Sequence, residues 1–202
     1  MKLYDRFIVF EGLDFTGKST QVKLLAARLR EAGYPVVTTR EPGGTPVGEE
    51  VRRVILSKKS VKLLPLSELL LFITARAQLC AEVIEPALRQ NKVVISSRYR
   101  LSSVAYQGYG RGIDLGLVLR LNEEATRGRC PDLTFLIDLP VSTALARKKG
   151  VVDRIEGEDH AFYRRVQDGY IQLARGDANI HRIDGTLSRE EIATQVRAWL
   201  DL

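Results

Sequence analysis

Residues 7–20 read FIVFEGLDFTGKST, and this stretch decides the fold of the chain. A short apolar run over 7–11 leads into GLDFTGKS at 12–19, which fits the pattern G-x-x-x-x-G-K-[ST] at every fixed position. Glycines in such a turn let backbone N–H groups point at phosphate oxygens, and the N-terminus of the following helix adds partial positive charge. The stretch therefore predicts a strand, a phosphate-binding loop and a helix, and with them a site for ATP or GTP.

The side chains of this loop have separate expected roles. Lys18 is expected to reach the β- and γ-phosphates as a catalytic residue, and the Ser19 hydroxyl is expected to ligate Mg²⁺. Glu11, at the end of the strand, is a second candidate ligand for the metal. The predicted ATP-binding residues of the loop are Gly12, Leu13, Asp14, Phe15, Thr16, Gly17, Lys18, Ser19 and Thr20.

Outward from the loop, short apolar runs alternate with longer segments of helical period. The runs at 36–39, 93–97, 133–139 and 180–184 join 7–11 as expected strands. Each is almost continuously apolar, as strands are when both faces of a parallel sheet are covered. The alternation predicts one doubly wound α/β domain over residues 1–202, a five-stranded parallel sheet flanked by helices in the P-loop NTP hydrolase fold.

The helical segments are marked by apolar residues at spacings of three and four. The helix after the loop carries four of them: Val22, Leu25, Ala26 and Leu29. Gly33 is expected to end this helix. The same period recurs over 47–55 and 162–173. In the last segment Ser188 and Glu191 form a capping box. One apolar stripe follows it: Ile192, Val196, Trp199 and Leu200.

The composition is that of an ordinary globular protein, with 45% hydrophobic and 28% charged residues in a chain of 202. No apolar run approaches the roughly 20 residues that a membrane span needs. The first apolar stretch runs directly into the glycine-rich loop, unlike a signal peptide. We therefore expect a cytoplasmic protein without a membrane partner.

The chain is basic, with a formal net charge of +6. Such a charge is compatible with a nucleic-acid-binding or switch-type NTPase as well as with a site that holds several phosphates. The basic residues are dispersed, however, and the longest run is only 147–149. Without a basic stripe interleaved with aromatic residues, the phosphate site is favoured and nucleic acid is not an expected partner.

Two arginines are placed where strands end. Arg40 follows the second expected strand and Arg98 the third, so both lie at the carboxyl edge of the sheet, where open α/β folds bind ligands. Two guanidinium groups at one edge can clamp a monophosphate through paired hydrogen bonds. An isolated arginine would more often be a solvated surface residue, and the pairing is what favours a phosphate site.

Six segments resemble thymidylate kinases, in order and along nearly the whole chain. They are FEGLDFTGKST (10–20), TREPGGTPVGE (39–49), LLLFITARAQ (69–78), SSRYRLSSVAYQGYGRG (96–112), ATRGRCPDLTFLIDLP (125–140) and DRIEGED (153–159). The resemblance implies transfer of a phosphoryl group from ATP to dTMP with Mg²⁺, with Arg40 and Arg98 on the dTMP phosphate. It also implies a homodimer, for which the apolar faces within 47–55 and 67–88 are candidates.

The same resemblance implies how the nucleoside is recognised. Phe72 and Arg76 are four residues apart on one helix face, and composition alone would place the aromatic ring in the core. The resemblance instead implies that Phe72 stacks on thymine, that Arg76 reads a base carbonyl, and that Gln107 completes base recognition. It also implies that Tyr106 closes the 2′ position of the sugar and that Asp14 faces the 3′-hydroxyl.

The segment 147–158 is expected to be a short lid. Thymidylate kinases place a catalytic arginine either in the phosphate loop or in the lid, and Phe15 occupies the loop position here. The resemblance therefore implies the bacterial type with a basic lid, in which Arg154 contacts the transferring group. The alternative is a charged surface loop. Arg147 is expected to pack against adenine, with Asp184 in the far wall of that pocket.

One position departs from the family pattern. The family reads Asp-Arg-Tyr at the end of the third strand, whereas this chain has Ser97 before Arg98. The missing carboxylate would help to hold Mg²⁺ or accept a proton, so we expect slower turnover or weaker Mg²⁺ dependence with nucleotide binding kept. Glu11 and Asp138 are candidate substitutes. A weakly active or inactive paralogue, or a kinase for another deoxynucleotide, remains the alternative to a dTMP kinase.

Overall fold

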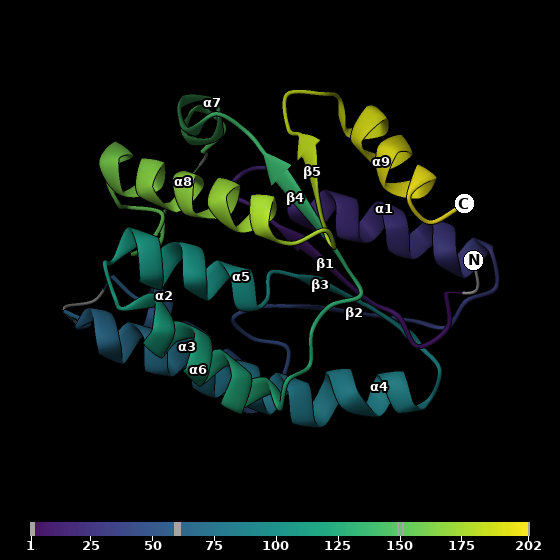
Figure 1. Cartoon of the computed structure of the whole chain (residues 1–202), viewed down its shortest axis with the longest axis horizontal. Coiled ribbons are helices and arrows are strands. Elements are labelled where there is room, and N and C mark those ends of the chain that lie inside the picture. Colours follow the sequence, from purple (N-terminus) through teal and green to yellow (C-terminus); the bar gives the residue numbers. More distant parts are fainter. Residues whose placement is uncertain (1–2, 59–61, 149, 151, 202) are drawn as a thin grey trace.

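Five parallel strands form one sheet in the computed structural model, which describes residues 3–58, 62–148, 150 and 152–201. The strands are β1 (Phe7–Glu11), β2 (Val36–Arg40), β3 (Val93–Ser97), β4 (Leu133–Asp138) and β5 (Ile180–Asp184). Their order across the sheet is β2-β3-β1-β4-β5, and every pairing is parallel (Figure 1). The predicted fold is confirmed, and the strand ends differ from prediction by one residue at most: β2 includes Arg40 and β4 ends at Asp138.

Helices cover both faces of this sheet (Figure 1). Their bounds are α1 (Lys18–Glu31), α2 (Pro46–Leu56), α3 (Pro65–Leu79), η1 (Cys80–Ile84), α4 (Glu85–Arg89), α5 (Arg100–Ser103), η2 (Val104–Gly110), α6 (Leu115–Thr126), α7 (Val141–Ala146), α8 (His160–Gly176) and α9 (Arg189–Ala198). On one face, α1 and α9 pack on apolar side chains of β1, β4 and β5. On the other, η1, α4 and α8 are among the segments that cover the strands. The labels η1 and η2 denote π-helical turns.

The helix after the phosphate loop follows its sequence pattern closely. α1 starts directly after Gly17, whose φ of 95° is left-handed, and it ends two residues before Gly33, whose φ is 85°. The four apolar residues predicted to share a face are all buried: Val22, Leu25, Ala26 and Leu29. Their burial fixes α1 against the sheet, so the helix N-terminus faces the end of β1.

The last helix confirms the capping box and revises its apolar stripe. Ser188 Oγ accepts from the Glu191 N–H at 3.2 Å, and Glu191 Oε2 accepts from the Ser188 N–H at 2.9 Å. α9 ends at Ala198, one residue before Trp199. The indole therefore lies on the surface, 54% exposed, and stacks on His181 with ring centroids 3.8 Å apart.

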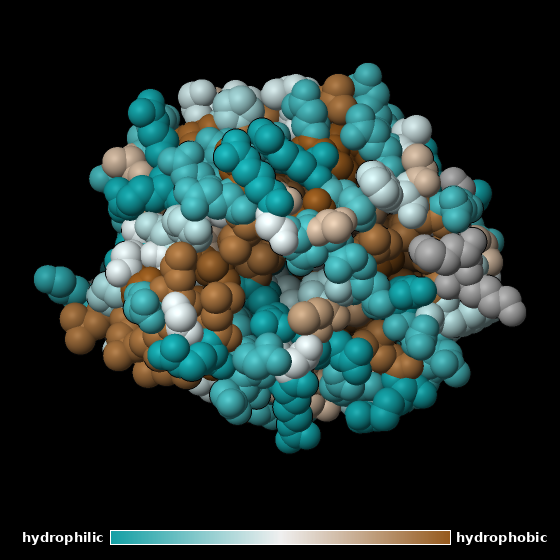
Figure 2. All heavy atoms as spheres, in the orientation of Figure 1, coloured by the Kyte–Doolittle hydropathy of each residue, from teal (hydrophilic) through white to brown (hydrophobic). Residues whose placement is uncertain are grey.

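The predicted helix over 47–55 forms as α2, but its apolar residues do not all face the core. Ile55 is buried, whereas Val47 and Val54 are about half exposed. Leu66 and Leu70 of the neighbouring α3 are exposed as well. Figure 2 shows apolar atoms gathered at the lower left, over the end of the molecule where α2, α3 and α6 lie in Figure 1.

The predicted lid lies between α7 and α8. Residues 149 and 151, which belong to this segment, fall outside the described residues. Asp153 organises the part that follows, because its Oδ1 accepts from the N–H groups of Ile155 and Glu156 at 2.9 and 2.8 Å. Within the described residues, no helix combines the length and the apolar character needed to cross a membrane.

Candidate active site

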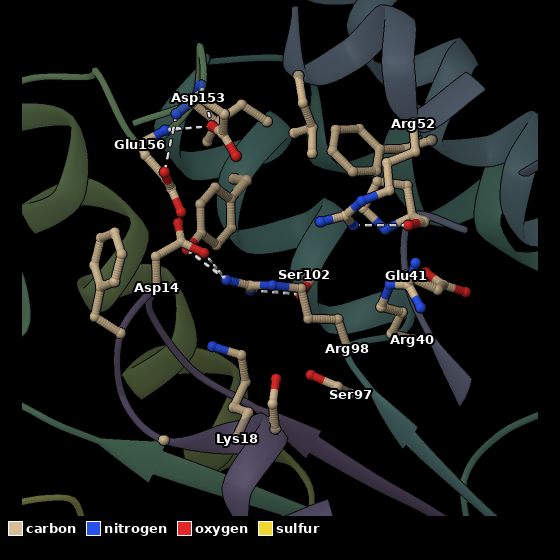
Figure 3. Close-up of a pocket in the computed structure, with 18 of the residues that line it drawn as sticks. Asp14, Lys18, Arg40, Glu41, Arg52, Ser97, Arg98, Ser102, Asp153 and Glu156 are labelled. Atoms are coloured by element: carbon tan, nitrogen blue, oxygen red, sulfur yellow. Dashed lines mark hydrogen bonds and ion pairs between the residues drawn. The ribbon is translucent and has the colours of Figure 1, made fainter. Parts of the chain in front are cut away.

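A cavity of about 450 Å³ opens at the carboxyl edge of the sheet (Figure 3). Its lining includes many of the side chains predicted for the site: Asp14, Phe15, Gly17, Lys18, Ser19, Thr20, Arg40, Phe72, Ser97, Arg98, Tyr106, Gln107 and Arg147. It also includes residues that were not predicted: Glu41, Pro42, Arg52, Leu56, Ser102, Asp153, Ile155 and Glu156. The loop after β1 and the ends of β2 and β3 therefore meet at one site, as expected for parallel strands.

The phosphate loop is held in a shape that few residue types allow. Gly12 has a φ of 135°, and a Cβ there would lie 2.4 Å from the carbonyl oxygen of Ile137. Lys18 curls back over the loop and donates to the carbonyls of Gly12, at 3.2 Å, and Leu13. Burial, and then the charge of Arg98, lower the pKa of Lys18 to about 7. A phosphate group would give this ammonium the anionic partner that neutral carbonyls cannot supply.

Arg98 links the loop to the far side of the cavity. Its φ of 76° is left-handed, a strained conformation for a non-glycine residue that is typical of functional sites. One terminal nitrogen donates to the Gly12 carbonyl and to Ser102 Oγ, both at 3.0 Å. The other donates to Asp14 Oδ1 at 2.5 Å and to the Tyr106 hydroxyl at 3.1 Å. The guanidinium is thereby aimed across the cavity (Figure 3).

Asp14 is an ionised acceptor in the wall of the cavity. Burial alone would raise its pKa, but the charges of Arg98 and Lys18 bring the pKa below its ordinary value. Its Oδ2 also accepts from the hydroxyls of Tyr106, at 2.9 Å, and Tyr163, at 3.2 Å. Asp14 and Tyr106 therefore lie side by side in the wall of the cavity. The predicted contacts of both residues with one sugar need this proximity.

Two further arginines stand together at the opposite wall (Figure 3). Arg40 is 55% exposed at its side chain and donates to Glu49 at 2.9 Å. Arg52 of α2 donates to the Pro42 carbonyl at 2.9 Å. Burial and the charge of Arg40 lower the pKa of Arg52, so like charges are crowded here. Such crowding suits a polyanion. Arg52 escaped prediction because only the packing of α2 brings it to the strand ends.

The acceptor wall is built by α3 and a π-helical turn. Phe72 of α3 is half-buried and lines the cavity. Tyr106 and Gln107 come from η2, and π-helical turns occur frequently at functional sites. Gln107 Nε2 donates to Glu68 Oε1 at 2.9 Å. The aromatic ring and the amide predicted to meet a base thus border the same cavity.

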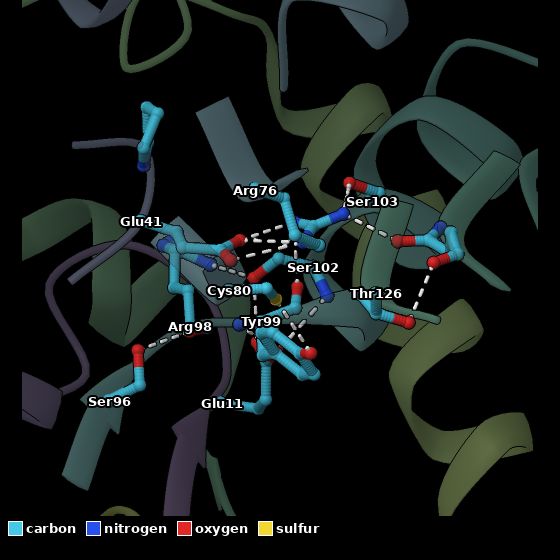
Figure 4. Close-up of polar contacts among 12 residues, drawn as sticks. Glu11, Glu41, Arg76, Cys80, Ser96, Arg98, Tyr99, Ser102, Ser103 and Thr126 are labelled. Atoms are coloured by element: carbon cyan, nitrogen blue, oxygen red, sulfur yellow. Dashed lines mark hydrogen bonds and ion pairs between the residues drawn. The ribbon is translucent and has the colours of Figure 1, made fainter. Parts of the chain in front are cut away.

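Arg76, which is predicted to read a base carbonyl, does not line the cavity in this structure. Its side chain has no exposed surface, and its nitrogens donate to Glu41, to Ser103 Oγ at 2.8 Å and to Asn122 Oδ1 at 2.5 Å (Figure 4). A further bond of 3.0 Å runs to the Tyr99 carbonyl. Arg76 supports the wall from behind, where its hydrogen-bonding groups are engaged.

Glu11, the second candidate metal ligand, likewise lies outside the cavity lining. It is fully buried and accepts from the Tyr99 N–H at 2.8 Å, from Ser102 Oγ at 2.6 Å and from the Tyr170 hydroxyl at 2.8 Å. Asp138 cannot replace the missing carboxylate either. It accepts from Gln167 at 3.0 Å and from Arg182 at 2.5 Å, outside the cavity lining.

The cavity still fits Mg²⁺ carried by a nucleotide. Ser19 and Ser97 place hydroxyl groups in its lining, and Asp153 and Glu156 add carboxylates. Mg²⁺ in phosphoryl-transfer sites is held mainly by substrate phosphates, waters and one or two protein oxygens. No group of three or more acidic, histidine or cysteine side chains forms a metal cluster in the described part of the chain. Ser19, the predicted ligand, is among the oxygen-bearing residues that line the cavity.

The lid brings Arg147 and two carboxylates to the cavity, but not Arg154. Arg154 is absent from the lining, and its guanidinium lies 2.6 Å from Glu68 Oε2, with Nε donating to the Ile55 carbonyl at 2.9 Å. Arg147 does line the cavity and donates to the Gly185 carbonyl at 3.4 Å. Asp184 accepts from Thr186 and lies outside the lining, and the hydrogen-bond partner of Arg147 is its neighbour Gly185.

Comparison with known proteins shows which family this chain resembles over most of its length. A family model described as thymidylate kinase matches residues 10–196. Thymidylate kinases of Kosmotoga olearia and Trichormus variabilis are 48% and 46% identical, over 94% and 96% of this chain and 92% and 95% of those proteins. The crystal structure of thymidylate kinase from Ehrlichia chaffeensis has a TM-score of 0.82 at 38% identity, covering 98% of this chain and 100% of that one. These similarities extend over both walls of the cavity.

Proposed function

The chain belongs to the thymidylate kinase family, and we propose that the cavity beside its phosphate loop is where the γ-phosphoryl group of ATP passes to dTMP. The protein is an ATP:dTMP phosphotransferase whose products are ADP and dTDP. One observation carries the assignment of the site. Lys18 and the arginines 40, 52 and 98 converge on one cavity that Phe72 and Gln107 also line.

The donor side of the cavity is the phosphate loop. We propose that the backbone N–H groups of the loop and Lys18 bind the β- and γ-phosphates. Ser19 would hold Mg²⁺, which neutralises charge on the β- and γ-phosphate oxygens when it is bound. Arg147, already beside Gly185, would cover the adenine. ATP then lies along the N-terminus of α1 with its γ-phosphate toward Arg98.

The acceptor side holds dTMP between α2, α3 and η2. Arg40, Arg98 and the additional Arg52 would bind its phosphate, while Phe72 stacks on the base. Tyr106 and Asp14 share a hydrogen bond and would meet the sugar at its 2′ and 3′ positions. This arrangement leaves the phosphate of dTMP facing the γ-phosphate of ATP across Arg98.

Transfer is a direct displacement. A phosphate oxygen of dTMP forms a bond to the γ-phosphorus as the bond to the β–γ bridging oxygen breaks, and ADP keeps that electron pair. Positioning and charge stabilisation are the protein's main contributions. Arg98 is anchored to the Gly12 carbonyl on the donor side and to Asp14 and Tyr106 on the acceptor side. These contacts support a role for Arg98 in bridging the two substrates.

The lid arginine must move to take part. We propose that 147–158 acts as a lid within one domain of 202 residues, and that Arg154 leaves Glu68 to contact the transferring group. Lids that close over phosphates commonly complete the catalytic constellation and exclude water. Arg154 is then a catalytic residue in the closed state and a packing residue in the present one.

We further propose that the protein works as a cytoplasmic homodimer. The exposed side chains of α2 and α3 support a self-association surface: Val47, Val54, Leu66 and Leu70. Contiguous exposed apolar residues of this kind often mark an interface. The requirement for ATP and dTMP supports the cytoplasm.

The function is tested by ADP release from ATP and Mg²⁺ with dTMP, dUMP, dCMP, dGMP, dAMP and UMP offered separately. We expect a strong preference for dTMP. Turnover with another nucleotide would overturn the roles of Phe72 and Gln107. Binding of dTMP without turnover would identify an inactive paralogue with an intact site.

A further inference from the structure

Glu68 is a buried carboxylate that joins three parts of the protein. It lies on α3 with 1% of its surface exposed. Its Oε1 accepts from Gln107 Nε2 at 2.9 Å and from Arg111 Nε at 3.1 Å. Its Oε2 accepts from Arg111 at 3.1 Å and from Arg154 at 2.6 Å. One side chain thus touches the acceptor wall, the segment after η2 and the lid.

The bond to Gln107 decides which end of that amide faces Glu68. An ionised carboxylate only accepts hydrogen bonds, so the NH₂ group of Gln107 must point toward it. Burial would raise the pKa of Glu68, but the hydrogen bonds and charge of Arg111, with those of Gln107 and Arg154, bring the pKa below its ordinary value. Glu68 therefore stays ionised at neutral pH. The carbonyl oxygen of Gln107 is left to meet an N–H donor of a base.

The bond to Arg154 helps to hold this side chain outside the cavity lining. The backbone N–H of Arg154 donates to the Leu56 carbonyl at 3.2 Å, and its Nε donates to the Ile55 carbonyl at 2.9 Å. Its other terminal nitrogen, Nη2, is buried and has no hydrogen-bond partner among the described residues. The docked position thus leaves one strong donor unsatisfied. A hydrogen bond from this nitrogen to an anion elsewhere would remove that free-energy cost.

Glu68 can release Arg154 without becoming an orphaned charge. Arg111 and Gln107 keep three hydrogen bonds on its two oxygens. Arg111 is itself fixed by Glu158 at 2.7 Å and by the ring of Phe162, 4.6 Å from its guanidinium carbon. Arg154 can therefore leave while Arg111 and Gln107 still satisfy Glu68.

We propose that Glu68 is a positioning residue for both halves of the reaction: it orients Gln107 toward the base of the acceptor and retains Arg154 until the phosphates of ATP draw it away. This inference rests on the proposed function for the identity of the acceptor. Its lid half concerns Arg154 alone and can be tested without any substrate.

The test compares Glu68→Gln with wild type. An amide at 68 can both donate and accept, so Gln107 loses its fixed orientation and Arg154 loses its charged partner. Hydrogen exchange of the ligand-free protein should rise roughly tenfold in the lid peptide that contains Arg154, the scale of one lost charge-assisted bond. In kinetics, the KM for dTMP should rise by a similar factor, and the ratio of kcat/KM for dTMP over dCMP should fall.

The matched control is Glu85→Gln, which removes another carboxylate held by an arginine, 2.6 Å from Arg129 on the surface. It should change neither lid exchange nor base selectivity. If Glu68→Gln does not fold, Glu68→Asp keeps the charge but shortens its reach and should shift both readouts in the same direction.

Unchanged lid exchange in a folded Glu68 variant would overturn the retention of Arg154. An unchanged dTMP to dCMP ratio would overturn the orienting of Gln107, because a merely structural loss would lower both acceptors equally. Failure of wild type to phosphorylate dTMP would instead remove the proposed function and leave the exchange result standing.

Discussion

At the scale of single residues, Lys18 makes nucleotide binding depend on pH. Burial and the charge of Arg98 lower its pKa to about 7, whereas phosphates beside the ammonium group favour the protonated form. At pH 8 most Lys18 side chains are neutral before ATP binds. We therefore expect ATP binding at this pH to take up roughly one proton per site.

Calorimetric titration in two buffers of different ionisation enthalpy measures that uptake. Lys18→Met should bind ATP without taking up this proton, and equal proton uptake by both proteins would contradict the prediction.

The lowered pKa of Lys18 also affects the stability of the protein. Between pH 7 and 10.5 the unfolded chain holds a proton here that the native, nucleotide-free protein has lost. This group therefore makes the free energy of unfolding rise with pH across that window.

Ser97 stands where the resemblance to thymidylate kinases implies an aspartate. Its side chain lies in the cavity near Lys18 and Arg98 (Figure 3). Glu11 and Asp138 are committed elsewhere, so no neighbouring carboxylate from β1 or β4 replaces the missing one. We expect Ser97→Asp to raise kcat by roughly 100-fold, the lower end of the range for a positioned acid–base group.

The control for this change is Ser97→Asn, which has the shape of aspartate without its charge. It should leave kcat at or below that of the natural chain, with the KM for dTMP little changed in either variant. Steady-state kinetics at several Mg²⁺ concentrations separate a metal effect from proton transfer. An unchanged or lower kcat for Ser97→Asp would contradict the prediction that a carboxylate at this position speeds turnover.

Among the site residues, the sequence could predict those whose place is fixed by the local backbone. Lys18 and Ser19 lie where a loop of eight residues must put them, and Arg98 lies directly after a strand end. Arg76 and Arg154 lie elsewhere because long side chains select partners that are distant in sequence. Arg76 pairs with Glu41, 35 residues away in the sequence, and Arg154 pairs with Glu68, 86 residues away.

At the scale of elements, the strands were predictable because parallel strands are buried on both faces and read as apolar runs. Helix positions followed from period and caps, as for α1 and α9. The period could not tell which apolar face of α2 meets the core, because exposed Val47 and buried Ile55 belong to the same pattern. The π-helical turns were also missed, since η2 carries no distinct period of its own.

Arg76 joins four elements, so its loss should cost far more stability than a surface arginine. It binds Glu41 at the end of β2, Ser103 of α5 and Asn122 of α6 from its own place on α3. Arg76→Met leaves Glu41 buried without its charge partner. Breaking a buried pair in this way costs about 3–5 kcal/mol.

Urea denaturation of Arg76→Met against wild type gives this difference. Arg89→Met is the matched control, because Arg89 lies 4.0 Å from Glu85 with 68% of its side chain exposed. Exposed pairs contribute about 0–1 kcal/mol. A second variant, Glu41→Gln with Arg76→Met, should recover part of the loss. Similar losses for Arg76→Met and Arg89→Met would show that the buried pair is not the tie between these elements.

At the scale of the whole molecule, the exposed apolar face of α2 and α3 lies directly behind the acceptor site. α2 contributes Arg52 to the cavity, and α3 contributes Phe72. Val47 and Val54 are 44% and 45% exposed, and Leu66 and Leu70 are 49% and 45% exposed. A symmetric dimer buries the same patch on both copies. Such an interface would stiffen the two helices that carry the acceptor contacts.

If this surface forms the dimer, we expect Leu70→Glu to yield a monomer at micromolar concentration, because the interface would then have to bury a carboxylate on each copy. Light scattering after size exclusion measures the mass directly. Leu24→Glu is the control, since Leu24 of α1 is 38% exposed on another helix. The monomer should keep its fold but bind dTMP less tightly, with the KM for ATP little changed, because the phosphate loop belongs to α1 and β1. A wild-type chain that is already monomeric would rule out this surface, and so would a Leu70→Glu variant that remains dimeric. An unchanged KM for dTMP in a monomeric variant would show that dimerisation does not affect the acceptor site.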